Sequence, residues 1–254
     1  MTVAQCAALV QGGDPDRFLS AMTGDEGARA RLFPLYAFNL EIARAPWLTA
    51  EETLARIRLQ WWREVIEEIF AGAPVRRHEV AEALAEVVRA ADLPRALLDR
   101  MIDAREEEIG GQHPRPLSPF IEGTAGALMR LSAQAAHGAP DAGLDAMASD
   151  LGRAHGIASY LAAQPALMER GLPALPPDEI AALAATGLDS LERAKTSRRT
   201  VPRAALPALR AAWRAPVRLR RAAARPNEVL QGVLETSEVR RRASLLWRTL
   251  TGAI

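Results

Sequence analysis

A nearly unbroken succession of helix signals limits most strongly what this chain can fold into. One stretch carries apolar residues at intervals of three and four, the spacing that places side chains on one face of an α-helix. These residues are Leu54, Ile57, Trp61, Val65 and Ile69. No segment shows the alternation of polar and apolar residues that is typical of a half-buried strand. The pattern therefore predicts an all-α fold.

Proline, glycine and capping residues divide the chain into successive expected helices. Pro34 is expected to interrupt the second helix, and Thr49 with Glu52 has the spacing of a capping box at the start of the third. The helices are expected at residues 15–22, 25–45, 50–72, 78–91, 95–109, 118–137, 143–164, 178–199, 203–223 and 227–250. No linker is long enough to separate domains, so residues 1–254 are expected to form one domain.

The composition excludes several classes of protein. The single cysteine, Cys6, cannot build a disulfide framework, and it lies in an N-terminal segment that is expected to be frayed. No apolar run approaches the roughly 20 residues that a transmembrane helix needs. The N-terminus lacks the basic region of a secretory or organellar leader. We therefore expect a cytoplasmic protein, with peripheral contact at the inner membrane as a further expectation.

Charges are distributed unevenly along the chain. Residues 193–254 contain 15 basic and 3 acidic residues, although the whole chain is almost neutral. Either the two parts form complementary faces of one fold, or the basic part binds an anionic membrane, a polyanionic ligand or an acidic protein. We expect no nucleic-acid partner, because no binding motif is present. The candidate basic surface consists of Arg198, Arg199, Arg203, Arg210, Arg214, Arg218 and Arg221, with Arg220 and Arg225 beside them.

Four segments, taken in order, carry a family likeness. They are "YAFNLEIAR", "LQWWREVIEEIFAG", "FIEGTAGALM" and "LGRAHGIASYLAAQPALMERGLPALP". Together they resemble the squalene/phytoene synthases, all-helical enzymes that join two isoprenoid diphosphates head to head. The first and last segments resemble the two helices that carry aspartates in that family. The resemblance implies an isoprenoid-synthase-type helical domain around a central cavity.

The aspartates of that family form two D-x-x-x-D motifs on facing helices, which hold Mg²⁺. Carboxylates four residues apart share one helix face, and Mg²⁺ prefers such oxygen ligands. Carried onto this chain, the motif positions fall at Ala43 and Trp47 and at Ala163 and Leu167. None of these side chains can coordinate a metal ion. The resemblance thus implies no bound cofactor and argues against catalysis.

Three shorter segments, "LYAFNLEIA", "IRLQWWRE" and "DAREEE", resemble a non-catalytic branch of the family. The mitochondrial member of that branch is an assembly factor of respiratory complex I (NADH:ubiquinone oxidoreductase). The resemblance implies that this chain also assists complex I assembly, with complex I subunits or intermediates as partners.

Two alternatives stay open. One is a Mg²⁺-dependent prenyltransferase that binds diphosphate by other residues, with Asp99, Asp103 and Glu108 as its acids and C-terminal arginines as counter-charges. The two aspartates also fit a solvated acidic face. The other is a protein that binds an apolar lipid or isoprenoid in the cavity without turning it over. The residues that the resemblance places along the cavity are Tyr36, Asn39, Glu108, Thr124, Ala127 and Ser159.

Overall fold

Helices make up all the regular secondary structure of the computed structural model, which describes residues 3–49, 51–110, 112–196, 201–234 and 237–254. This confirms the predicted all-α class. Within those ranges, no helix is both long and apolar enough to cross a membrane.

The first half contains α1 (Val3–Gly13), α2 (Pro15–Ala21), α3 (Glu26–Arg44), η1 (Ala45–Trp47), α4 (Glu52–Phe70), α5 (Glu79–Ala90) and α6 (Arg95–Glu106). The second half contains α7 (Leu117–Ile121), η2 (Glu122–Gly126), α8 (Ala127–His137), α9 (Ala142–Ala162), α10 (Gln164–Glu169), α11 (Pro177–Thr196), η4 (Arg203–Ala205), α12 (Leu206–Leu209), η5 (Arg210–Ala212), α13 (Ala215–Ala224), α14 (Pro226–Val229) and α15 (Glu238–Thr251).

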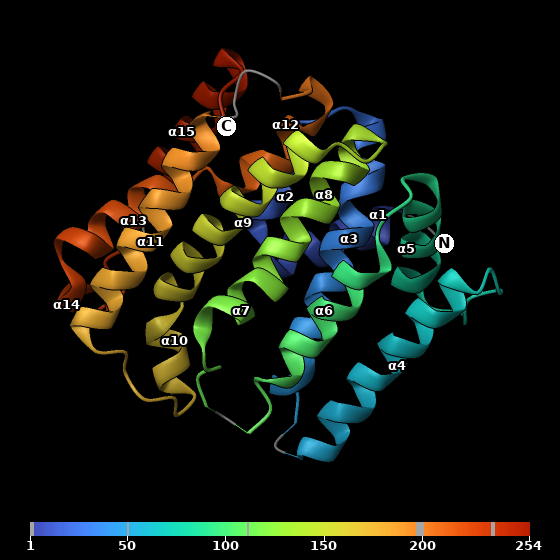
Figure 1. Ribbon diagram of the computed structural model, residues 1–254, viewed down its shortest axis with the longest axis horizontal. Helices are drawn as coiled ribbons and strands as arrows, with labels where there is room; N and C mark the ends of the chain where they lie inside the picture. The colour runs from blue at the N-terminus through green and yellow to red at the C-terminus, as the bar shows by residue number, and fades with distance from the viewer. Residues whose placement is uncertain (1–2, 50, 111, 197–200, 235–236) are drawn as a thin grey trace.

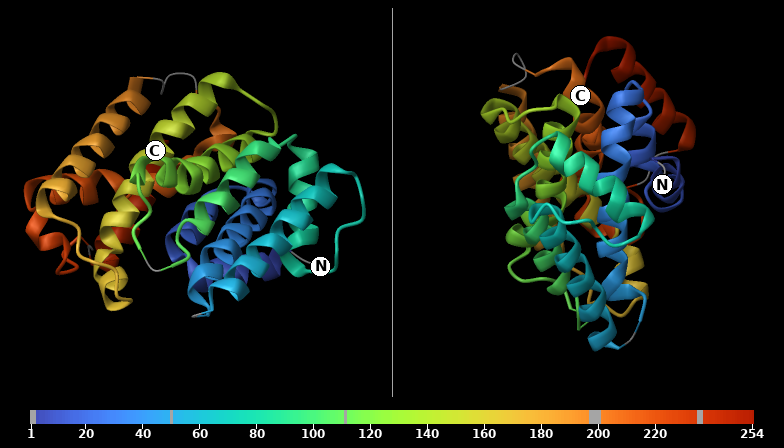
Figure 2. Two further views of the ribbon diagram at one scale, coloured as in Figure 1. Left: turned by 60° about the horizontal axis from the view of Figure 1, so that its bottom comes forward. Right: turned by 90° about the vertical axis from the view of Figure 1, so that its right-hand side faces the viewer.

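Three helices, α3, α8 and α9, form the middle of the molecule and pack side by side in that order (Figures 1 and 2). On one side, α1, α5 and α6 pack against α3, and α4 covers α6. On the other side, α11 packs between α9 and α13. Buried apolar side chains accordingly form two clusters, one around α3 and one around α9. Their removal from water is the main favourable contribution to folding.

The N-terminal segment is a helix rather than a frayed end. α1 packs against α3 and α5, and Cys6 on its inner face is fully buried. Burial raises the pKa of the Cys6 thiol to about 11, so the thiol is neutral and unreactive at physiological pH. The expectation of a frayed segment was wrong because tertiary packing, which local sequence does not reveal, holds this helix in place.

Pro34 does not interrupt α3, which continues through it from Glu26 to Arg44. A proline in a helix removes one backbone hydrogen bond and crowds the preceding turn. Here the helix is buried along most of its middle, where Pro34 and its neighbours pack into the cluster around α3. The burial of that face outweighs the local penalty.

The predicted apolar face of α4 is correct only toward the end of the helix, where Val65 and Ile69 are buried. Leu54 and Ile57 are 43% and 58% exposed, and the helix also buries Leu59, Trp62 and Ile66. The Trp62 ring lies 5.1 Å from that of Phe38 on α3, so the inner face is set by this aromatic contact. The capping box is also absent, because α4 starts after Glu51 and the Thr49 hydroxyl accepts from the Glu51 N–H.

The expected helices at 203–223 and 227–250 are each divided. Pro207 and Pro216 start new helical segments, since proline is accommodated in a first turn but not in a helix interior. Farther along, Gly232 has a φ of +75°, and the chain turns there between α14 and α15. Of the resulting short segments, η4 and α12 pack against α8, whereas α13 and α14 pack against α11.

Candidate functional site

A cavity of about 350 Å³ lies where the start of α2 and the end of α6 approach η2, α9 and α13. Asn39 of α3 and Leu167 of α10 complete its wall. The charged groups on this wall are Asp14, Asp16, Arg17, Arg105, Glu108 and Arg218. Apolar side chains, Phe120, Ile121 and Leu167 among them, cover the rest. The cavity therefore offers both charged groups and an apolar surface to a ligand.

Of the residues expected along the cavity, Asn39, Glu108, Thr124 and Ser159 line it. Tyr36 and Ala127 do not, and both pack in the cluster around α3. The Cζ atom of Arg17 lies over the Tyr36 ring, 5.7 Å from its centroid, so Arg17, which lines the cavity, covers the tyrosine. Ala127 follows the π-helical turn, which changes the register of the residues after it.

That π turn, η2, shapes one wall of the cavity. It spans Glu122–Gly126 between α7 and α8, and such turns occur frequently at functional sites. The small residues of the segment permit close helix packing: a Cβ at Gly152 of α9 would lie 2.8 Å from the Gly126 Cα. Within the turn, the Thr124 hydroxyl donates to the Phe120 carbonyl at 2.8 Å and is thereby held in the wall.

The four degenerate motif positions lie in two places. Ala163 and Leu167, where α9 passes into α10, line the cavity, and the Leu167 N–H donates to the Ala163 carbonyl at 2.9 Å. Ala43 and Trp47 lie at the end of α3 and in η1, outside the lining. The Arg170 guanidinium lies over the Trp47 ring at 5.0 Å. A cation–π contact thus connects the segments that carry the two motif positions.

The residues present do not fit a magnesium clamp. The side chains at the four motif positions have no oxygen, and Mg²⁺ needs oxygen ligands. The carboxylates that do reach the cavity, Asp14, Asp16 and Glu108, are each ion-paired with arginine. Throughout the part of the chain that the structure describes, no three His, Cys, Asp or Glu side chains are grouped so that they could hold a metal ion.

Asp14 and Arg17 form one polar end of the cavity. Asp14 is the N-cap of α2 and accepts from the Arg17 N–H at 2.9 Å, and its second oxygen pairs with the Arg17 guanidinium at 2.6 Å. Burial opposes ionisation of this carboxyl, but the Arg17 charge and these hydrogen bonds more than compensate and lower its pKa. The aspartate is therefore held as an anion and fixes the position of Arg17.

His155 of α9 contacts the other side of the same guanidinium, with 3.1 Å between its Nε2 and an Arg17 nitrogen. Burial first, and then the charges of Arg17 and Arg218, lower the pKa of His155 from 6.5 to about 3. The imidazole is thus neutral at physiological pH and accepts a hydrogen bond from Arg17.

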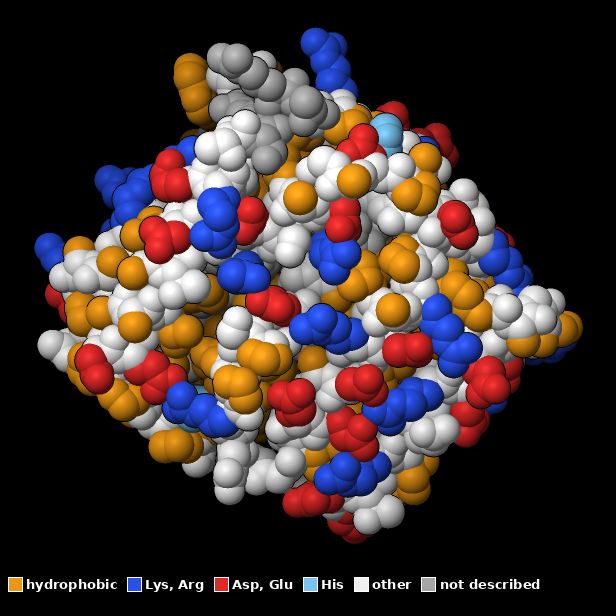
Figure 3. Space-filling model, viewed as in Figure 1, with side chains coloured by type: hydrophobic (Ala, Val, Ile, Leu, Met, Phe, Trp, Pro, Cys, Tyr) orange, Lys and Arg blue, Asp and Glu red, His pale blue; other side chains and the backbone are white. Residues whose placement is uncertain are grey.

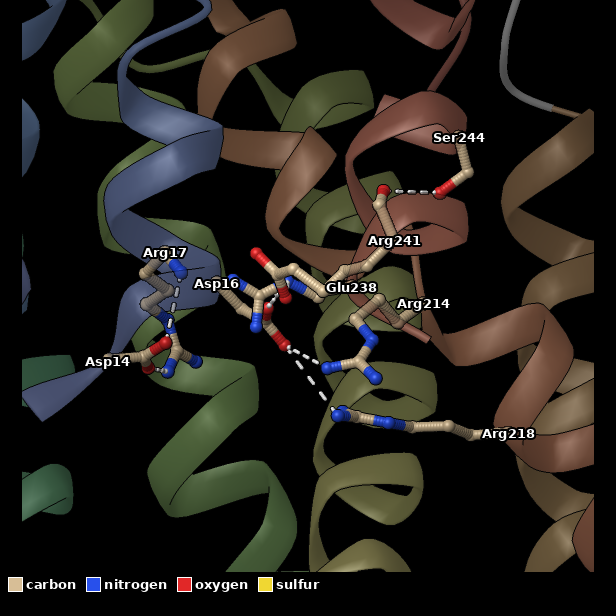
Figure 4. A network of polar contacts seen from close by, with 8 residues as sticks. All are labelled: Asp14, Asp16, Arg17, Arg214, Arg218, Glu238, Arg241 and Ser244. Atoms are coloured by element: carbon tan, nitrogen blue, oxygen red, sulfur yellow. Dashed lines mark hydrogen bonds and ion pairs between the residues drawn. The ribbon is translucent and has the colours of Figure 1, made fainter. Parts of the chain in front are cut away.

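Asp16 lies on the neighbouring side of α2, between α13 and α15 (Figure 4). Its carboxylate is 2.8 Å from the Arg214 guanidinium and 3.6 Å from those of Arg218 and Arg241. One N-terminal aspartate therefore joins two C-terminal helices to α2. This contact supports the interpretation that the acidic and basic parts of the chain are complementary.

The predicted basic surface is wrong in part, because three of its arginines are buried. Arg210, Arg214 and Arg218 are 4%, 9% and 9% exposed and so lie inside the molecule. Arg210 donates to the Thr23 hydroxyl and to the Ala253 carbonyl, which again connects both ends of the chain. Arg203, Arg220, Arg221 and Arg225 are exposed, and Arg198 and Arg199 lie outside the described residues. Helix periodicity could not distinguish these groups, because the partners come from distant segments.

Glu108 lies at the opposite polar end, just past α6. It pairs with Arg105 at 2.7 Å, and the Arg105 guanidinium lies 5.6 Å from the centre of the Phe120 ring. Nearby, the Tyr160 hydroxyl is 2.5 Å from Nδ1 of His113, whose Nε2 contacts the Pro173 carbonyl. Burial raises the pKa of Tyr160, so it remains a neutral phenol.

Asp99 and Asp103 do not reach the cavity. They lie on the outer face of α6, where Asp99 pairs with Arg95 and Asp103 pairs with Arg63 of α4. On the face shown in Figure 3, acidic and basic side chains alternate over α4 and α6. This is the solvated acidic face, and it lacks the facing carboxylates that a prenyltransferase clamp requires.

Several cavity residues were not found from the sequence, among them Asp14, Asp16, Arg17 and Arg105. The only available signal was "GDPDRF", in which an aspartate before proline is typical of a helix N-cap. That signal indicates where α2 begins. It carries no information about the distant arginines and histidine that α2 meets.

Comparison with known proteins agrees with this architecture. The family model for squalene/phytoene synthase matches residues 10–243. The chain belongs to the squalene/phytoene synthase family. Among solved structures of this family's fold, squalene synthase HpnC from Alicyclobacillus acidocaldarius superposes with a TM-score of 0.73 at 15% identity, covering 91% of this chain and 94% of that one. A dehydrosqualene synthase in complex with ligand gives 0.68 at 13% identity, covering 98% and 95%. The expected isoprenoid-synthase-type fold is thereby confirmed.

Relatives with higher identity carry a different description. The human protein called NADH dehydrogenase (ubiquinone) complex I, assembly factor 6, is 29% identical over 163 residues, which are 63% of this chain and 48% of that protein. Its counterpart from Rattus norvegicus is 30% identical over 176 residues, or 68% and 52%. The chain thus spans about half the length of these relatives.

Proposed function

We propose that this chain is a non-catalytic member of the squalene/phytoene synthase family that assists the assembly of respiratory complex I. The observation that carries the proposal is the loss of oxygen at all four clamp positions, Ala43, Trp47, Ala163 and Leu167. Relatives described as complex I assembly factor 6 support it. Under this proposal the chain needs no metal cofactor, and its partners are complex I subunits or intermediates.

The cavity supports a non-catalytic role over the prenyltransferase alternative. Its carboxylates are neutralised by arginines within the protein, so they are not available as a pair facing a metal-bound diphosphate. A volume of about 350 Å³ is also at the low end of ordinary ligand pockets, whereas the family reaction joins two isoprenoid diphosphates.

A deletion strain of the source organism tests the proposed function. We expect loss of NADH:ubiquinone oxidoreductase activity, unchanged polyprenoid content, and restoration of activity by the wild-type gene. Affinity purification of the tagged protein from native membranes should recover complex I subunits. Normal complex I activity together with altered polyprenoids would contradict the proposal and favour the transferase.

A second candidate, binding of an apolar ligand in the cavity, is favoured by the surface of Phe120, Ile121 and Leu167. Such a ligand would meet Arg17 or Arg105 with its polar end. Mass spectrometry of lipids extracted from the purified protein tests this. We expect one lipid class to be enriched over the cell extract, and its abundance should fall in an Ile121→Gln variant; an unenriched extract would contradict it.

A further inference from the structure

The outer face of α15 carries a stripe of exposed apolar side chains. Val239, Leu246 and Leu250 are 78%, 61% and 75% exposed. Leu246 and Leu250 lie about two and three helical turns after Val239, so the three residues share one face. Trp247, 69% exposed, lies beside Leu246. Single exposed apolar residues are ordinary, but four on one helix face indicate a surface that is covered in use. Figure 2 shows α15, in dark red, along the outside of the molecule.

Arginines flank this stripe on both sides. At about 100° per residue, Arg240 and Arg242 fall on opposite sides of the line through Val239 and Leu250. Both are exposed. Leu245, on the inner side, is the buried residue of the helix. The helix therefore has an apolar face, basic flanks and a narrow contact with the protein, which is the pattern of a helix that lies in a membrane interface.

A basic cavity of about 280 Å³ lies between α15 and α13, beside the stripe. Its lining includes Arg214, Arg218, Arg221, Arg240, Arg241 and Arg248, together with Ser244. Among the residues that the structure describes, no carboxylate lines it, although Asp16 and Glu238 contact some of these arginines from its edges. Val217, which is 41% exposed, lies at the same cavity.

The positive charge of this region does not depend on any single arginine being unpaired. Residues 193–254 contain 15 basic and 3 acidic residues, so the part of the chain that forms the walls of this cavity is basic as a whole. Guanidinium groups match phosphate oxygens in planar, bidentate geometry. An apolar stripe next to a cluster of arginines therefore complements a surface that presents phosphates over acyl chains.

We propose that α15 and the adjoining cavity form a binding site for anionic phospholipid membranes. The stripe of α15 enters the acyl boundary, with Trp247 at headgroup level where tryptophan is enriched. The arginines of the cavity bind a lipid phosphate. This site shares Arg218 with the cavity between α2 and α9 but is otherwise formed by other residues, and it does not depend on a role in complex I assembly.

Co-sedimentation of the full chain with vesicles tests the proposal. We expect binding to phosphatidylcholine vesicles that contain phosphatidylglycerol, much weaker binding to pure phosphatidylcholine, and loss of binding at high salt. Intrinsic fluorescence should shift to the blue on binding. A Trp247→Phe variant should still bind but lose most of that shift, because Trp62 and Trp213 are buried and Trp47 and Trp61 are half-buried, whereas Trp247 is exposed.

Two double variants separate the parts of the site. Leu246→Gln with Leu250→Gln, and Arg221→Gln with Arg240→Gln, should each weaken binding about tenfold or more. Matched controls on α4 and the turn after it, Leu54→Gln with Ile57→Gln and Arg58→Gln with Arg77→Gln, should bind as the wild type does, since they change similar exposed residues elsewhere.

Any of three other outcomes would overturn the proposal. Absence of wild-type binding to either vesicle would mean that the stripe is covered by a protein instead. Equal binding to neutral and anionic vesicles would eliminate the phosphate site. Unchanged binding of the Leu246/Leu250 variant, with melting temperatures matching the wild type, would eliminate α15 as the contact.

Discussion

At the scale of single residues, the charged wall of the cavity combines local ion pairs with one cluster that joins distant segments. Asp16 forms that cluster, since its side chain contacts arginines from both α13 and α15. Removal of one member of a buried ion cluster is costly because the partner charges stay behind without compensation.

Replacement of Asp16 by asparagine should therefore lower the free energy of unfolding by about 2–4 kcal/mol. The isosteric amide keeps the shape of the side chain but removes the charge that faces Arg214. Asp99→Asn is the control, because it removes an exposed pair with Arg95 and should cost less than about 1 kcal/mol. Urea denaturation measures both, and equal effects would show that the Asp16 cluster contributes no more than a surface pair.

His155 makes stability depend on pH in a defined window. Its pKa is about 3 in the folded protein and 6.5 in the unfolded chain, so only the unfolded chain gains a proton between these values. Stability must then fall as the pH is lowered through this window. From pH 7 to pH 5 the wild type should lose about 2 kcal/mol more than His155→Gln.

Denaturation of both proteins at pH 7 and pH 5 provides the measurement. Folding lowers the pKa of Asp14 from its unfolded value of 3.8, so this carboxyl affects the pH dependence of stability only below about that pH and not between pH 5 and pH 7. Parallel pH dependence of the two proteins would mean that His155 is already accessible to protons in the folded state.

At the scale of elements, the approach of α9 to the π turn depends on glycine. A Cβ at Gly152 would lie 2.8 Å from the Gly126 Cα and 3.0 Å from the Ala125 carbonyl oxygen, and backbone atoms cannot yield cheaply. The close approach of these elements forms the wall that contains Thr124. Small residues are thus required here by packing.

Gly152→Ala should accordingly destabilise the protein by about 1–3 kcal/mol, although alanine is the better helix former. Gly12→Ala is the matched control, because nothing lies within 4 Å of its Cβ and it is helical in α1. That change should stabilise by up to about 1 kcal/mol. Thermal unfolding distinguishes the two, and a stabilising Gly152→Ala would show that α9 can move away from η2.

At the scale of the whole molecule, the fold is that of solved squalene and dehydrosqualene synthases, while the four positions that the resemblance assigns to a metal clamp carry no side-chain oxygen. Addition of Mg²⁺ with a farnesyl diphosphate analogue should therefore leave the melting temperature unchanged. A site occupied at 100 times its dissociation constant would contribute about 2.7 kcal/mol, which is readily detected. The analogue without Mg²⁺ is the control for binding to arginines alone. A large magnesium-dependent shift would show that Ala43, Trp47, Ala163 and Leu167 are not the clamp positions.

The sequence by itself determined the fold class and the family, and it has no side-chain oxygen at the four positions that the resemblance assigns to the clamp. Helix type follows from local spacing and propensity, and most long helices, such as α5, α6 and α9, lie close to their expected ranges. The absence of oxygen at Ala163 and Leu167 is a property of residue identity, so no structure was needed to see it.

Only the tertiary structure decided which side chains face inward and which partners they meet. Leu54 and Ile57 fit the apolar periodicity of a helix but are exposed to solvent, because the Trp62–Phe38 contact sets the inner face of α4. Arg214 and Arg218 are indistinguishable in sequence from Arg221, yet Asp16, about 200 residues away, holds two of them inside the molecule. Burial and pairing depend on segments far apart in the chain, and local periodicity carries no information about those distances.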